Sequence, residues 1–163
     1  MAAKRQAPSD WTSVLGRWLL GALFVYMGLS KALNPEAFLK LVRQYELVSN
    51  AFLLNSIAAT LPWFEVFCGL LLLAGVAVRG TALVTAALLV PFTIAVWRRA
   101  LAISTAKALA FCAVKFDCGC GSGEVLICHK LMENSLLILL ALWLMFSKGE
   151  VLCARFSLFR RKP

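Results

Sequence analysis

The sequence has little charge for its length. Lys, Arg, Asp and Glu together make up 15% of its 163 residues, whereas 61% of the residues are hydrophobic. The low charge and high apolar content exclude an intrinsically disordered chain. The apolar share also exceeds the roughly 45–50% that is usual for a soluble domain. The class of protein that remains is an integral membrane protein.

Several signatures of enzyme chemistry are missing. The sequence contains no Walker phosphate-binding loop, no Gly-x-Gly-x-x-Gly motif and no His-Glu-x-x-His motif. Its single histidine argues against haem or di-metal chemistry. We therefore expect no resident metal, and no cofactor is evident from the residues.

Basic residues outnumber acidic ones by 17 to 8, which gives a formal net charge of +9. In a soluble protein this excess would suggest nucleic-acid binding. In a membrane protein it is typical of the segments that flank the spans. We expect the lipid bilayer as a partner and no nucleic acid.

Hydrophobic runs predict four membrane spans, because a spanning helix needs about 20 mostly apolar residues. The first span ends at Asn34-Pro35, since proline pushes the preceding residue out of the helical region. No signal-type cleavage site follows this span, so we expect it to remain uncleaved. We expect a tight turn at Arg79-Gly80 and a loop between the last two spans. The predicted spans are residues 11–33, 55–78, 81–97 and 130–146.

Between the first two spans, residues 36–50 carry apolar side chains at helical spacing with charges between them. This pattern predicts a short amphipathic helix at the membrane interface. The predicted fold is an all-α integral membrane four-helix bundle with this helix between spans one and two. We expect one domain over residues 1–163, ending in a basic tail at 147–163.

Polar and small residues form matching stripes on the first two spans. Glycines on such a face allow two helices to approach closely, and charges there face the bundle interior. The first stripe steps by four and three residues, which keeps its members on one helix face. The stripes are Arg17, Gly21, Phe24, Gly28 and Lys31, and Pro62, Glu65, Gly69 and Leu72.

A carboxylate near the bilayer centre is costly, so Glu65 needs a partner. Depth along the helices, at about 1.5 Å per residue, favours Tyr26 or Lys31 over Arg17. These four residues form the expected intramembrane polar network. At the start of the last span, His129 and Glu133 are four residues apart and can meet on one helix face. They could form a proton relay or an ordinary interfacial pair.

The sharpest chemical feature is Cys118-Gly119-Cys120. Four of the six cysteines lie between Cys112 and Cys128. Three interpretations stay open: a strained, exchangeable Cys118–Cys120 disulfide, a metal site that adds Cys128 and His129, or a structural bridge from Cys118 or Cys120 to Cys112 or Cys128. We take the redox pair as the leading hypothesis.

Four spans place both termini on one side of the membrane. The densest basic cluster is Arg160-Arg161-Lys162, and the turn at Arg79 carries no acidic residue. Both observations favour cytoplasmic termini. The Cys-x-Cys loop then faces the periplasm or exterior, where disulfides persist.

The order and spacing of several short motifs resemble the DoxX/MauE superfamily of four-span membrane proteins, and the MauE branch in particular. The resemblance covers roughly residues 14–144. The motifs are Arg17…Gly21…Gly28-x-Ser30-Lys31, Asn34-Pro35-x-x-Phe38, Tyr45-x-Leu47, Leu61-Pro62-Trp63-x-Glu65 and Phe92-Thr93, followed by the Cys-x-Cys loop.

The resemblance implies a redox-associated role in the bacterial inner membrane. MauE-like proteins are thought to work with a thioredoxin-like periplasmic partner on a disulfide-containing client. Only Cys118 and Cys120 match the expected redox pair. Our first hypothesis is therefore a thiol–disulfide exchange helper that supports maturation of a partner. The alternative is a non-catalytic subunit of a larger membrane complex. A quinone bound within the bundle is a third, weaker hypothesis, because only the buried polar stripe supports it.

Overall fold

The structure is a computed structural model that describes residues 8–45, 50–118 and 123–147. Its secondary structure is almost entirely helical, with one small hairpin. The elements, in chain order, are α1 (Pro8–Leu33), α2 (Pro35–Gln44), α3 (Ala51–Ala74), α4 (Val78–Lys107), the 3-10 helix η1 (Phe111–Ala113), β1 (Lys115–Asp117), β2 (Glu124–Leu126) and α5 (Ile127–Phe146).

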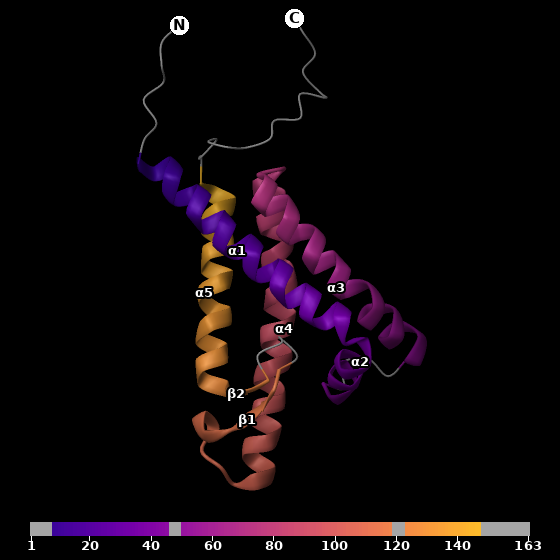
Figure 1. Cartoon of the computed structure of the whole chain (residues 1–163). Helices are drawn as coiled ribbons and strands as arrows, with labels where there is room; N and C mark the ends of the chain where they lie inside the picture. The colour runs from indigo at the N-terminus through magenta and orange to yellow at the C-terminus, as the bar shows by residue number, and fades with distance from the viewer. Residues whose placement is uncertain (1–7, 46–49, 119–122, 148–163) are drawn as a thin grey trace, which may run out of the picture.

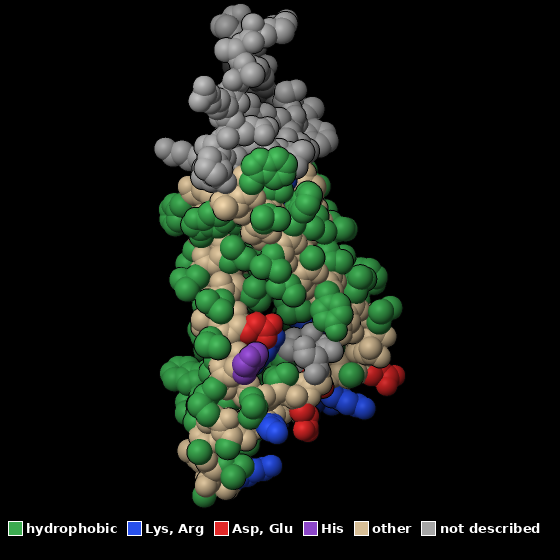
Figure 2. Space-filling view, turned by 60° about the vertical axis from the view of Figure 1, so that its left-hand side comes forward, with side chains coloured by type: hydrophobic (Ala, Val, Ile, Leu, Met, Phe, Trp, Pro, Cys, Tyr) green, Lys and Arg blue, Asp and Glu red, His purple; other side chains and the backbone are tan. Residues whose placement is uncertain are grey.

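Four of these helices, α1, α3, α4 and α5, are long and apolar enough to cross a membrane. Helix α1 begins and α5 ends at one end of the bundle, whereas α2 and the β1–β2 hairpin lie at the other (Figure 1). We call this second end the hairpin end. Figure 2 shows apolar side chains covering the lateral face and charged side chains gathering toward the hairpin end. The predicted all-α membrane bundle is confirmed.

The helices pack as two pairs, α1 with α3 and α4 with α5 (Figure 1). The first pair meets through glycine. A Cβ atom added at Gly21 would lie 2.8 Å from the carbonyl oxygen of Gly69, and one at Gly28 would lie 2.7 Å from that of Pro62. The two backbones are therefore in direct contact, as small residues permit in membrane helices. Every member of both predicted stripes is buried.

Two clusters of buried side chains hold the pairs together. The larger cluster includes Leu20 and Phe24 of α1, Leu72 of α3, and Leu137 and Leu144 of α5. Its residues in α3, α4 and α5 lie toward the end of the bundle that is opposite the hairpin. The smaller one, which we call the hairpin cluster, lies at the hairpin end and consists of Val96, Ala100, Val114, Cys118 and Ile127.

The third span differs from its prediction at both ends. Helix α4 begins at Val78, so Arg79-Gly80 lies inside its first turn and the predicted turn there is wrong. The chain reverses earlier, because Gly75 takes a left-handed conformation (φ 71°) that ends α3. Helix α4 then continues ten residues beyond Trp97. Arginine is a good helix former, so Arg98-Arg99 marks the edge of the apolar segment without ending the helix.

The hairpin replaces part of the predicted loop. Strands β1 and β2 pair antiparallel, with Phe116 opposite Val125 and Asp117 opposite Glu124. Both residues of the central pair favour strands. Helix α2 is confirmed at Pro35–Gln44, while part of its predicted extent, residues 46–49, lies outside the described residues. The basic tail at 148–163 lies outside them as well.

Candidate functional site

A disulfide joins Cys112 in η1 to Cys128 in α5, with a Cα–Cα distance of 5.1 Å. The two cysteines are 16 positions apart in the sequence, and the whole hairpin lies between them. The disulfide therefore holds η1 and the start of α5 together around the hairpin. We call the Cys112–Cys128 bond the staple.

Cys118 follows the last residue of β1 and is also disulfide-bonded. Its partner sulfur lies outside the described residues, as do Cys120 and Cys153. Because Cys112 and Cys128 bond each other, the predicted structural bridge from the Cys-x-Cys loop to either of them is wrong. The alternative interpretation as a metal site is wrong for the same reason, since a sulfur held in a disulfide is not a thiolate ligand.

The Cys118 residue is almost completely covered. Only 1% of it is exposed, and it packs in the hairpin cluster against residues of α4 and α5. Hydrogen bonding also fixes its backbone, because the Tyr45 hydroxyl donates to the Cys118 carbonyl oxygen at 3.2 Å. The Cys-x-Cys segment thus starts from an immobilised residue.

Tyr45 lies just after α2 and reaches the hairpin across the bundle end. Its ring meets Phe92 of α4 edge to face, with 6.4 Å between ring centroids. Burial raises the pKa of the Tyr45 hydroxyl, and Arg99 only partly opposes this shift. The hydroxyl therefore keeps its proton and remains a donor at neutral pH.

Lys31 in the last turn of α1 pairs with Glu65 in the middle of α3. The Lys31 ammonium nitrogen lies 2.6 Å and 2.7 Å from the two carboxylate oxygens. It also lies 5.4 Å from the ring centroids of Phe38 and Phe92. These contacts compensate both charges inside the bundle, as a buried ion pair requires.

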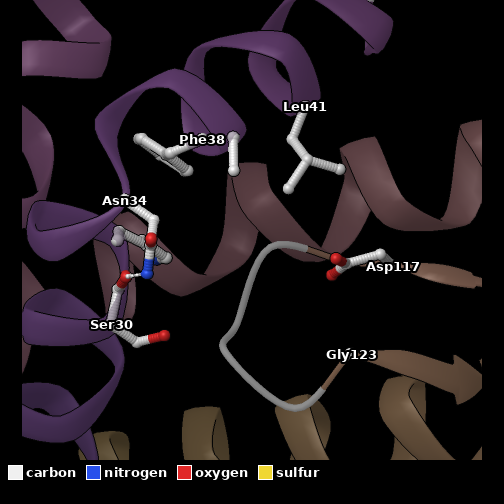
Figure 3. A pocket seen from close by; sticks show the side chains of 8 residues that line it. Ser30, Asn34, Phe38, Leu41, Asp117 and Gly123 are labelled. Carbon is white, nitrogen blue, oxygen red and sulfur yellow. Dashed lines mark hydrogen bonds between the residues drawn. The ribbon is translucent and has the colours of Figure 1, made fainter.

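A cavity of about 210 Å³ separates the α1–α2 corner from the hairpin. Ser30, Asn34, Phe38 and Leu41 border one side, and Asp117 borders the other (Figure 3). Asp117 directly precedes Cys118 in the sequence. Lys31 lines the cavity too, so the buried ion pair lies at its border. The cavity therefore brings the intramembrane charges and the cysteine segment to one place.

The structure separates the other two members of the predicted intramembrane network. Tyr26 is 57% exposed on the outer surface of α1, so the alternative that pairs it with Glu65 is wrong. Arg17 is 3% exposed and lies 14 residues before Lys31 in α1. At about 1.5 Å per residue, the two are roughly 20 Å apart along the helix. Lys31 is thus the partner of Glu65.

The predicted relay at the start of α5 takes a different form. Glu133 accepts a hydrogen bond from Lys130, at 3.0 Å. Lys130 is buried at 2% exposure, whereas His129 lies on the exposed side of the helix. An i,i+3 pair competes directly with the i,i+4 pair that the sequence suggested. Within the described residues, no side-chain hydrogen bond or ion pair involves the His129 imidazole.

Sequence reasoning missed three polar residues at the hairpin end. Helical spacing predicts only an apolar role for Tyr45, but its hydroxyl has a specific acceptor in the Cys118 carbonyl oxygen. Arg99 donates to the Gln44 carbonyl oxygen at 2.6 Å and to the Gln44 side-chain oxygen at 3.2 Å. Asn134 is 1% exposed, next to Lys130 on one face of α5. No periodic pattern reveals the long-range contacts of Tyr45 and Arg99.

Comparison with known proteins identifies the family of the chain. The sequence profile described as methylamine utilisation protein MauE matches residues 9–147, which contain all four candidate spans and the hairpin. Neither a curated protein nor a solved structure matches the chain. Because the match covers far more than half of the sequence, the chain belongs to the MauE family.

Proposed function

We propose that this membrane-associated accessory protein exchanges a disulfide between its Cys-x-Cys segment and a partner protein. The observation that carries the proposal is the independence of the Cys118 disulfide from the staple. One disulfide holds the hairpin, so the other is free to open without loss of the fold. Cys120 is the neighbouring cysteine in sequence, and we assign it as the partner of Cys118.

The burial of Cys118 gives the sulfurs of Cys118 and Cys120 different roles in the proposed exchange. Attack on a disulfide needs access to the sulfur that is attacked. Because only 1% of Cys118 is exposed, we assign Cys120 as the sulfur that an incoming thiolate attacks. The S–S bond to Cys118 breaks, a mixed disulfide forms on Cys120, and Cys118 leaves as the thiolate.

A second thiol of the partner completes the reaction. It attacks the partner's sulfur in the mixed disulfide and releases Cys120. The partner thereby loses two electrons and two protons and gains a disulfide, while Cys118 and Cys120 become a dithiol. The reverse reaction reduces a partner disulfide by the same steps, so no further reactant is needed for one turnover.

The cavity beside Asp117 gives the partner a place to bind. Its apolar side, with Phe38 and Leu41, and its polar side, with Ser30 and Asn34, suit an extended peptide segment. We assign the Lys31–Glu65 pair a supporting role, because it fixes the α1–α3 corner that forms the border of this cavity.

The proposed setting is the bacterial inner membrane, with both termini in the cytoplasm and the hairpin end in the periplasm. A disulfide that is formed at this end persists only in an oxidising compartment. The proposed partner is a thioredoxin-like periplasmic protein or a disulfide-containing client.

Trapping in cells tests the proposal. In Cys118→Ser, Cys120 forms a mixed disulfide that Cys118 can no longer resolve, so a partner adduct should accumulate on Cys120. Cys120→Ser should give far less adduct, because the remaining thiol is buried. Cys68→Ser is the matched control, since Cys68 is a buried free thiol in α3.

Two results would overturn the proposal. One is the absence of any adduct in both variants under oxidising conditions. The other is a partner that purifies in fixed ratio with the Cys118→Ser, Cys120→Ser double variant and still matures, which would identify a non-catalytic subunit of a complex.

A further inference from the structure

The end of α2 is fastened to two other parts of the hairpin end. Arg99 of α4 donates two hydrogen bonds to Gln44, one to its carbonyl oxygen and one to its side-chain oxygen. The next residue, Tyr45, packs its ring against Phe92 and donates its hydroxyl to the Cys118 carbonyl. The contacts join residues that are 55 and 73 positions apart in the sequence.

The acceptor of the Tyr45 hydroxyl, the Cys118 carbonyl oxygen, lies directly after the end of β1. The strand pairing ends at Asp117 opposite Glu124, so the Cys118 carbonyl lies one residue past the last ladder pair. A buried carbonyl needs a donor to offset the loss of water. Tyr45 supplies one, at the residue where the chain leaves the strand and enters the Cys-x-Cys segment.

We propose that Tyr45 is a positioning residue that stabilises the disulfide-bonded conformation of Cys118, and that Arg99 holds Tyr45 in place through Gln44. The inference rests on the proposed exchange at Cys118 and adds a residue that tunes it. Tyr45 acts through the backbone of Cys118 and does not touch the reacting sulfur. Its hydrogen bond fixes the direction in which the chain enters the disulfide.

The geometry gives the direction of the effect. The hydrogen bond belongs to the oxidised form described here, so losing it destabilises the disulfide relative to the dithiol. A neutral hydrogen bond of ordinary strength changes such an equilibrium by about fivefold. For a two-electron couple, that factor corresponds to a reduction potential about 20 mV higher.

The test is a redox titration of the full-length protein in lipid nanodiscs. Samples are equilibrated with oxidised and reduced dithiothreitol, quenched with acid, unfolded and then alkylated, so that burial of Cys118 does not limit its labelling. The labelling of Cys118 and of Cys112 is read by peptide mass spectrometry. Tyr45→Phe removes the hydroxyl and keeps the ring on Phe92. Tyr26→Phe is the matched control, because Tyr26 is the only other tyrosine and lies on the outer surface of α1.

We expect Tyr45→Phe to shift the equilibrium of the Cys118 disulfide about fivefold toward the dithiol, which raises its reduction potential by about 20 mV. The staple, and the Tyr26→Phe variant, should be unchanged. Arg99→Gln should shift the same disulfide in the same direction by a smaller factor. The staple serves as an internal reference, because a general loss of packing would move both disulfides together.

The titration distinguishes a failure of the proposed function from a failure of the role assigned to Tyr45. If the Cys118 disulfide of the unsubstituted protein never exchanges with dithiothreitol, the proposed function fails. If it exchanges and Tyr45→Phe titrates like the unsubstituted protein, or moves the staple equally, the assignment of Tyr45 is wrong and the exchange stands.

Discussion

The α1–α3 interface and the hairpin end are stabilised in different ways. In the interface, Gly21, Gly28 and Gly69 bring two backbones into contact, and one ion pair, Lys31–Glu65, lies between the helices. At the hairpin end, contact depends on the staple and on single hydrogen bonds from Tyr45 and Arg99. The first region is built by close packing along whole helices. The second combines the small hairpin cluster with a few point contacts, which is compatible with the disulfide exchange that we propose there.

The difference predicts that substitutions within the interface cost stability, whereas substitutions at the hairpin end change chemistry. Glu65→Gln should have the largest effect. It leaves the Lys31 ammonium buried without its counter-charge, which costs about 3–5 kcal/mol for a broken buried pair. Thermal unfolding of the purified protein in nanodiscs measures this loss.

The double variant Lys31→Met, Glu65→Leu is the control for that experiment. Replacing both charges with apolar side chains removes the penalty and should restore most of the stability. Full stability of the Glu65→Gln single variant would contradict the assigned ion pair.

Gly69→Ala should have the next largest effect. The added Cβ would lie 2.7 Å from the carbonyl oxygen of Gly21, so the two backbones must separate. Overpacking of this kind costs about 1–3 kcal/mol. The free energy of unfolding of the variant measures it.

Gly80→Ala is the matched control, because the Cβ added at Gly80 meets nothing within 4 Å. It should leave stability unchanged or raise it by up to about 1 kcal/mol, since alanine favours the helix. Equal losses at Gly69 and Gly80 would show that helix propensity, and not interhelical contact, controls the effect.

The periodicity of the sequence was sufficient to predict the α1–α3 interface. The steps of four and three residues from Arg17 to Lys31 place one face of α1 against α3, and all of that face is buried. Hydropathy located all four spans, although their ends differ by a few residues. Helix α4 differs most, because Arg98-Arg99 is compatible with a helix that continues beyond the apolar segment.

The hairpin end was much less predictable. Three-residue strands carry too short an alternation to be recognised, and cysteine spacing alone cannot assign pairs among six cysteines. The contact between Tyr45 and Cys118 links residues 73 positions apart, and no local pattern encodes it. Tyr26 failed as a partner of Glu65 because depth along the helix says nothing about which face a side chain occupies.

Selective reduction tests the central claim most directly. The unsubstituted protein in nanodiscs is treated with increasing dithiothreitol, quenched with acid and unfolded, and alkylation of Cys118 and Cys112 is then followed separately. If Cys118 belongs to the exchangeable pair, it should become labelled at a reductant concentration that leaves the Cys112–Cys128 staple intact. Simultaneous labelling of both cysteines, or earlier labelling of Cys112, would contradict the division into one exchangeable and one structural disulfide.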